Sequence, residues 1–220
     1  FDTVYYAARI KSGVFWSSST AVFSMWLLEG ILISANRILQ MDPFLLLKTV
    51  APLLYALNVC GVYHFSRKGL NWNVKTALIA AFFFSFQLAS LRLSWDFYRN
   101  MLGLAILLFT LPLIRGIEKT KNFVLLLALS LLLVLSHTLV AGVLFAVVLS
   151  TFISHWLKRD RLRSLTLLLA ILPASALLFT SLFVFPFTPY TPENIMDSRD
   201  AVHQSPLGIF FLVDYLSVSD

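Results

Sequence analysis

The feature that most constrains this chain is a series of long apolar stretches separated by short charged segments. Each is about 18–22 residues long, enough for a helix to cross a hydrocarbon layer of about 30 Å. The clearest are residues 44–65, 74–91, 97–114 and 165–185. Hydrophobic residues make up 59% of the chain and charged residues 13%, whereas a soluble domain carries about 25% charged residues. The sequence therefore predicts an integral membrane protein, an all-α polytopic bundle of transmembrane helices.

A further apolar stretch, residues 123–153, is too long for one ordinary spanning helix and is interrupted by Ser136, His137 and Thr138. We expect two shorter helices that meet at this break, which would lie somewhat below the membrane surface. One long tilted helix with a buried histidine is the alternative. With two helices here, the predicted bundle over residues 44–185 has about six spans.

Basic residues gather in the loops after the first, third and fifth predicted spans. These loops hold ten of the 17 basic residues: Arg67, Lys68, Lys75, Arg115, Lys119, Lys121, Lys158, Arg159, Arg161 and Arg163. Basic loops stay on the cytoplasmic side of a membrane. We therefore expect a multi-pass protein of the cell membrane with these loops inside, and the net charge of +6 needs no nucleic-acid partner.

The segment before the first clear span is predicted to lie outside, as an external loop with juxtamembrane helices over residues 1–43. Residues 21–39 include Glu29 and Arg37, and a span here would place the next basic loop on the wrong side. An interfacial helix removes this conflict. Asp42 and Pro43 fit the N-cap and the first position of the following helix.

The end of the chain is predicted to form an external loop over residues 186–206 and the start of a further span over residues 207–220. The chain begins without Met and stops inside an apolar stretch, so we expect a fragment that lacks at least one earlier span. Its single cysteine, Cys60, excludes an intrachain disulfide.

Two carboxylates on the predicted external side are candidates for chemistry, Asp2 and Asp96. An aspartate just before a helix is commonly an N-cap. The other interpretation is a general base or a metal ligand. Asp96 lies in a polar cluster with Arg92, Arg99 and Asn100, and charged groups between two spans often mark a substrate path.

His137 lies at the predicted break on the same side as both aspartates. A lone histidine in a membrane is often a packing residue hydrogen-bonded to a neighbouring helix. Alternatively, its imidazole binds phosphate or helps to hold a metal. The sequence has no Gly-rich phosphate loop, serine nucleophile elbow or zinc-protease helix, so the energy for any transfer reaction would come with a substrate from the membrane.

The order of these motifs resembles the GT-C superfamily of polytopic membrane glycosyltransferases, which includes oligosaccharyltransferase catalytic subunits, protein O-mannosyltransferases and lipid A aminoarabinose transferases. The segment from Phe1 to Gly13 looks like the start of that family's first external loop, and residues 41–65 look like the next span. Asp96 matches an acidic residue two spans later, although its loop has no acidic pair. The runs 96–103 and 135–138 are similar to prokaryotic members, archaeal ones among them.

This resemblance implies transfer of a sugar from a polyprenyl-phosphate-linked donor to an acceptor protein, lipid or glycan on the external face. It implies catalytic roles for Asp2 and Asp96, which would also share a divalent cation, Mg²⁺ or Mn²⁺. The substrate and its phosphate would be bound by Arg92, Arg99, Asn100 and His137.

Two other functions stay open at this point. One is a transporter or flippase for a lipid-linked substrate, and the other is a non-catalytic membrane assembly subunit. Transporters tend to place ionisable groups near the bilayer midplane and to show internal repeats. Here the charges gather at one boundary and the sequence shows no repeat, which favours the transferase.

Overall fold

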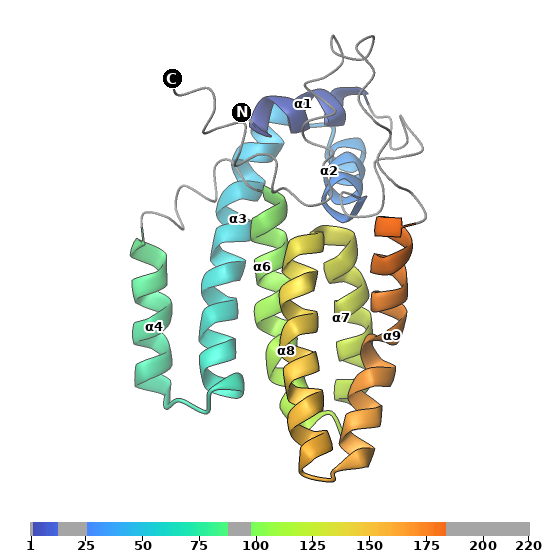
Figure 1. The fold of residues 1–220 in the computed structure, drawn as a ribbon. Coiled ribbons are helices and arrows are strands. Elements are labelled where there is room, and N and C mark those ends of the chain that lie inside the picture. Colours follow the sequence, from blue (N-terminus) through green and yellow to red (C-terminus); the bar gives the residue numbers. More distant parts are fainter. Residues whose placement is uncertain (1, 13–25, 88–97, 184–220) are drawn as a thin grey trace, which may run out of the picture.

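The computed structural model describes residues 2–12, 26–87 and 98–183, and within these ranges the chain forms helices and no strand (Figure 1). A π-helical turn, η1 (Phe65–Gly69), follows α3, and a 3-10 turn, η2 (Leu111–Gly116), follows α6. The helices are α1 (Asp2–Ser12), α2 (Trp26–Leu39), α3 (Pro43–His64), α4 (Val74–Phe86), α6 (Tyr98–Thr110), α7 (Thr120–Ser136), α8 (Thr138–Leu157) and α9 (Arg161–Phe183).

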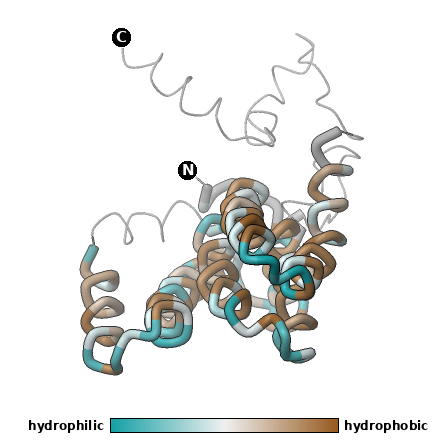
Figure 2. The backbone as a smooth tube through the Cα atoms, turned by 60° about the horizontal axis from the view of Figure 1, so that its bottom comes forward, coloured by the Kyte–Doolittle hydropathy of each residue, from teal (hydrophilic) through white to brown (hydrophobic). Residues whose placement is uncertain are grey.

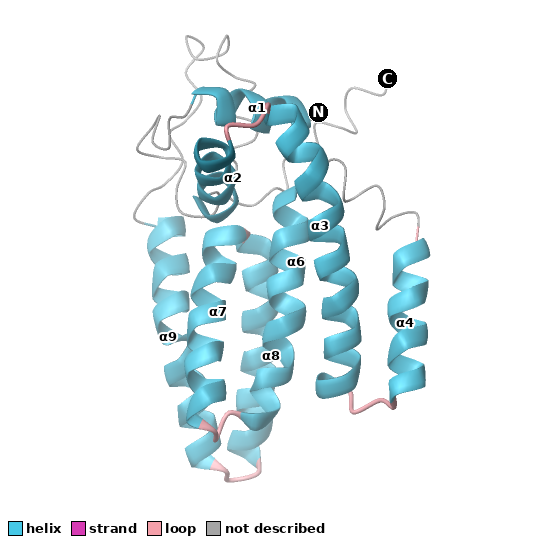
Figure 3. Cartoon of the chain, turned by 180° about the vertical axis from the view of Figure 1, so that it is seen from behind, coloured by secondary structure: helices cyan, strands magenta, loops and turns pink. Residues whose placement is uncertain are grey.

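The helices from α3 onward run side by side and alternate in direction, while α1 and α2 lie at one end of this bundle (Figure 1). Seen from behind, α1 crosses that end and short connections join the helices at the opposite end (Figure 3). Within the described residues, α1 and α2 thus lie beside the bundle that begins with α3, and their place on the external side of a membrane stays a prediction. Residues 186–206 and 207–220 lie outside the described part of the chain.

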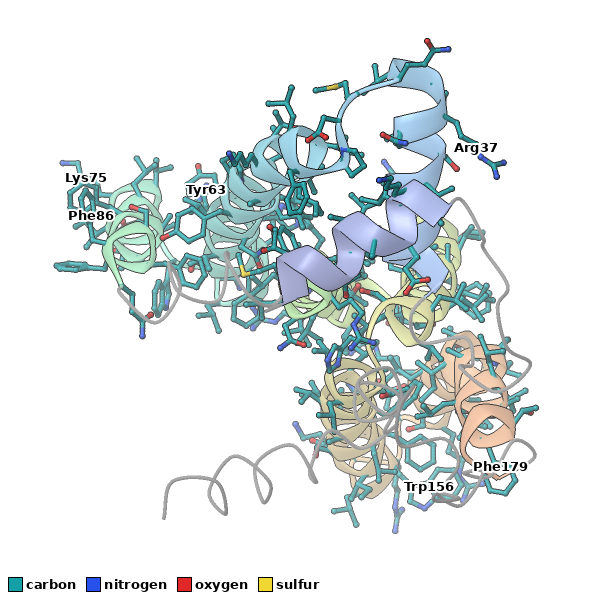
Figure 4. All side chains as sticks on the ribbon, turned by 90° about the horizontal axis from the view of Figure 1, so that it is seen from above. Arg37, Tyr63, Lys75, Phe86, Trp156 and Phe179 are labelled. Carbon is teal, nitrogen blue, oxygen red and sulfur yellow. The ribbon has the colours of Figure 1, made fainter. Side chains whose placement is uncertain are left out.

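Among the described residues, four stretches are long and apolar enough to cross a membrane: Pro43–Gly69, Tyr98–Gly116, Thr138–Leu157 and Arg161–Thr180. The shorter apolar helices are α4 and α7. Large apolar side chains cover the outer faces; Phe83 of α4, for example, is 70% exposed. Seen along the bundle, α4 lies to one side and packs on α3 (Figure 4). Such a surface is stable in lipid and not in water, so the fold indicates a membrane protein.

The predicted break at His137 is confirmed. The residue is extended, with φ −161° and ψ 114°, between the last residue of α7 and the first of α8. Its N–H donates to the carbonyl of Leu133 at 2.8 Å, and its carbonyl accepts from the N–H of Ala141 at 3.0 Å. These bonds close both helices at the break, so the alternative of one long helix is wrong.

The start of α3 is also as predicted. Asp42 Oδ1 accepts hydrogen bonds from the N–H groups of Phe44 and Leu45, at 3.0 and 3.1 Å. Pro43 occupies the first turn, where its missing N–H costs nothing. This cap fixes the point at which the chain turns from α2 into the bundle.

The helix predicted over residues 74–91 is shorter in the structure, because α4 ends at Phe86. The hydroxyl of Tyr55, on α3, donates to the carbonyl of Ser85 at 2.7 Å and lies 3.3 Å from that of Phe84. This side chain satisfies backbone groups that a helix end leaves free. A partner 30 residues away therefore helps to set the end of α4.

The three basic loops lie at the end of the bundle opposite α1, where Figure 2 shows hydrophilic residues at the turns and apolar residues along the helices. Contacts tie these turns together. Arg115 Nη1 donates to the carbonyl of Gly69 at 2.5 Å, and Arg163 Nε donates to Glu118 Oε1 at 2.5 Å. The predicted clustering of basic residues at one end is thus observed, and the side of the membrane that they face stays a prediction.

Two buried clusters hold the bundle together, and α6 belongs to both. One joins α6, α7, α8 and α9 around Leu133 and Leu144. The other joins α1, α2, α3 and α6 around Tyr6, Leu47 and Met101. Helices α1 and α2 are thus packed onto the bundle through apolar side chains, which fixes their position relative to the first turn of α6.

Candidate functional site

The first turn of α1 lies against the first turn of α6. The hydroxyls of Thr3 and Tyr98 are 3.5 Å apart although the residues are separated by 95 positions. The rings of Tyr6 and Tyr98 meet edge to face, with their centroids 5.7 Å apart at 79°. Both rings are buried, and burial of aromatic rings in this geometry is favourable. The start of the chain is therefore held beside the start of α6.

A second contact brings α6 to the break between α7 and α8. A Cβ atom at Gly103 would lie only 3.1 Å from the Cβ of His137 and 3.4 Å from Cγ2 of Val140. Such a separation is tighter than most real contacts, so a side chain at this position would push its neighbours aside, whereas glycine lets α6 approach the break without that shift. The approach places His137 beside the first two turns of α6.

Buried polar atoms at this break have no hydrogen-bond partner among the described residues. They are the hydroxyl of Ser136, whose residue is 0% exposed, and Nδ1 of His137. Buried polar atoms are nearly always satisfied in folded proteins, because an unpaired one costs about 1–3 kcal/mol. A partner for either atom must therefore come from outside the described residues.

The junction carries a positive charge. The imidazole of His137 lies in the connection between α7 and α8, where Arg99 of α6 acts on it electrostatically. A guanidinium near an imidazole suits an anion with several oxygen atoms, such as a phosphate.

The structure brings some of the predicted site residues together and leaves others undescribed. Arg99 and Asn100 are half-buried in the first turn of α6, and Arg99 acts on His137 across the junction. Asp2 begins α1, next to the residue that meets Tyr98, but its side chain is not described. Arg92 and Asp96 lie outside the described residues, so the pairing of Asp2 with Asp96 stays a prediction.

The predicted metal site falls on the same undescribed groups. Among the side chains that the structure does describe, no three His, Cys, Asp or Glu residues gather in a way that could hold a metal ion. Neither Asp2 nor Asp96 contributes a side chain to that set. A Mg²⁺ or Mn²⁺ ion between them is therefore still a prediction.

Sequence patterns did not reveal two groups near the junction. Tyr98 precedes Arg99 in a stretch typical of the membrane interface, yet it is only 4% exposed because Tyr6 and Thr3 cover it. Glu29 of α2 is also 4% exposed and has an interaction partner. It is the only buried carboxylate among those with described side chains. Nothing local in the sequence signals either burial, since both depend on how α1 and α2 pack.

In the part of the chain that the structure describes, fold and site define a helical bundle with four helices able to cross a membrane and a polar junction at one end. Searches against protein-family models, curated proteins and solved structures find no match to this chain. The resemblance to the GT-C superfamily therefore stays a prediction from the motifs.

Proposed function

We propose that this chain forms part of a membrane glycosyltransferase of the GT-C kind. It would move a sugar from a polyprenyl-phosphate-linked donor to an acceptor at the end of the bundle that carries α1 and α2. One observation supports this most: Arg99 acts electrostatically on His137 at a junction beside the start of α1, where buried polar atoms have no partner among the described residues. A phosphate held there would be at the boundary between apolar helices and an external segment.

The donor fits the chemistry of this boundary. Its isoprenoid tail would lie along the apolar surfaces of the bundle, and its phosphate would accept hydrogen bonds from the Arg99 guanidinium and from an N–H of His137. Arg92 and Asn100 would complete this site from the connection before α6 and from its first turn. Because the leaving phosphate gains negative charge as the sugar departs, a cation fixed in advance lowers the barrier to transfer.

Asp2 would act on the acceptor. Its carboxylate would take the proton of the acceptor nucleophile as that atom forms a bond to the anomeric carbon of the sugar. The bond from that carbon to the phosphate oxygen breaks, and the oxygen keeps the electron pair. Asp96 would position the reactants with Asp2, and a divalent cation bound to both would supply further positive charge for the phosphate.

The test is a transfer assay with the full chain in proteoliposomes, given radiolabelled polyprenyl-phosphate mannose or glucose. We expect Asp2→Asn and Asp96→Asn each to lower the rate of product formation by about a hundredfold or more, the size typical of a lost general base. Asp42→Asn is the matched control. It removes a carboxylate at the same end of the bundle but keeps an N-cap for α3, and it should leave transfer unchanged.

Full transfer by both mutants would defeat the assignment. The same assay separates the transporter and flippase alternatives. Labelled donor that crosses the vesicle membrane without giving any covalent product would identify a transporter or flippase. A covalent product that depends on Asp2 would support the transferase.

A further inference from the structure

The turn between α8 and α9 combines basic side chains with exposed apolar ones at the end of the bundle opposite the junction. Lys158, Arg159 and Arg161 are exposed there. Trp156 is 50% exposed, and Leu157 and Leu162 are each 77% exposed. In a membrane, such a turn lies where the acyl chains give way to the headgroups.

Some charged side chains of this region form ion pairs and others do not. Arg163 Nε contacts Glu118 at 2.5 Å and Asp160 at 3.3 Å. Asp160 also lies 3.7 Å from Nδ1 of His155. The nearby carboxylates are therefore occupied.

The remaining cations have no such partner. Within the described part of the chain, Lys158, Arg159 and Arg161 make no ion pair with a carboxylate. The guanidinium carbon of Arg161 lies 5.8 Å from the centroid of the Trp156 ring, within the range of a cation–π contact. This contact holds Arg161 at the edge of the apolar surface and leaves its charge uncompensated.

The backbone of the turn gives independent evidence that Arg159 serves more than the turn itself. The N–H of Asp160 bonds to the carbonyl of His155 at 3.0 Å, and the N–H of Arg159 bonds to that of Trp156 at 3.0 Å. This is the Schellman pattern that closes a helix, and Arg159 occupies its left-handed position with φ 63°. Glycine is usual there because other residues are strained. Arginine at this position is therefore strained. Compared with glycine, it adds a charged side chain to the turn.

We propose that the α8–α9 turn is a binding site for the headgroup of an anionic phospholipid. The phosphate would lie against Arg159, Arg161 and Lys158, and the acyl chains would run along Leu157 and Leu162. The site requires a negative charge and two apolar chains together, which a lipid of the surrounding bilayer provides. This proposal does not depend on the proposed transfer reaction, because the site lies at the other end of the bundle.

Lipid retention by the full chain in detergent, measured by native mass spectrometry, tests this site. The probes are phosphatidylglycerol and phosphatidylcholine with identical acyl chains. We expect the wild-type chain to retain the anionic lipid preferentially, and Arg159→Gly with Arg161→Gln to weaken that retention by about fivefold for each cation removed. Lys68→Gln with Lys75→Gln, a matched pair at the η1–α4 turn, should keep the preference.

Arg159→Gly alone separates a binding role from a structural one. Glycine suits the left-handed position, so the thermal midpoint should stay the same or rise while retention of the anionic lipid falls. Equal retention of both lipids by the wild-type chain would overturn the site, and so would equal losses from the two paired variants. Displacement of the lipid by millimolar glycerol phosphate would also overturn it, because the site would then bind a free phosphate and not a lipid.

Discussion

Gly103 allows α6 to approach the α7–α8 break, and its replacement tests how tightly the junction is packed. Gly103→Val would place side-chain atoms against His137 and Val140. We expect a loss of about 1–3 kcal/mol of stability from this overpacking, together with reduced transfer. Gly142→Val on α8 is the control, since nothing lies within 4 Å of a Cβ there. Thermal unfolding in detergent measures both; equal midpoints for the two variants would show that the junction yields freely.

At the scale of single residues, the sequence predicted at which end of the bundle a side chain lies better than which side chains are in contact. Arg99 and His137 were expected at the same end because an even number of crossings separates them. No pattern in the sequence indicated their electrostatic coupling or the close approach of α6 to the break at Gly103. The burial of Tyr98 depends on α1, whose position is set by packing across 95 residues.

Among the elements, α3 offers the clearest test of a local signal. Asp42→Ala removes the acceptor for the N–H groups of Phe44 and Leu45 and should cost about 1 kcal/mol of stability. Asp42→Asn keeps an equivalent cap, so its midpoint should stay within a few tenths of a kcal/mol of the wild type. Unfolding of the two variants in the same detergent measures the difference. Equal losses would mean that the charge of Asp42 matters and its cap does not.

Helix limits were predicted well where the cause is local and poorly where it is not. The cap at Asp42 and the break at His137 depend on neighbouring residues, and both are confirmed. Helices α7 and α8 have 17 and 20 residues, longer than the predicted pieces of 123–153. The polar residues at their ends are still helical, because the backbone hydrogen bonds of a helix continue through polar residues as well as apolar ones. The end of α4 was missed because its partner, Tyr55, lies on another helix.

At the scale of the molecule, successive helices of the bundle alternate in direction. Helices α1 and α2 lie at one end, and the basic turns lie at the other (Figures 1 and 2). Cysteine labelling tests whether these ends face opposite sides of a membrane. The native thiol is first removed by Cys60→Ser. Ala8→Cys and Ser34→Cys then report the α1–α2 end, and Lys68→Cys and Thr120→Cys report the basic end; all four positions are exposed.

An impermeant maleimide added to intact cells should label positions 8 and 34, while positions 68 and 120 should react only after the membrane is opened. The expected direction follows from the retention of basic loops on the cytoplasmic side. Labelling of positions 8 and 120 from the same side would contradict the prediction that the helices of the bundle cross the membrane. Labelling of only the basic end in intact cells would reverse the orientation and move the Arg99–His137 junction to the cytoplasmic face. A polyprenyl-phosphate donor would then have to be used from inside the cell.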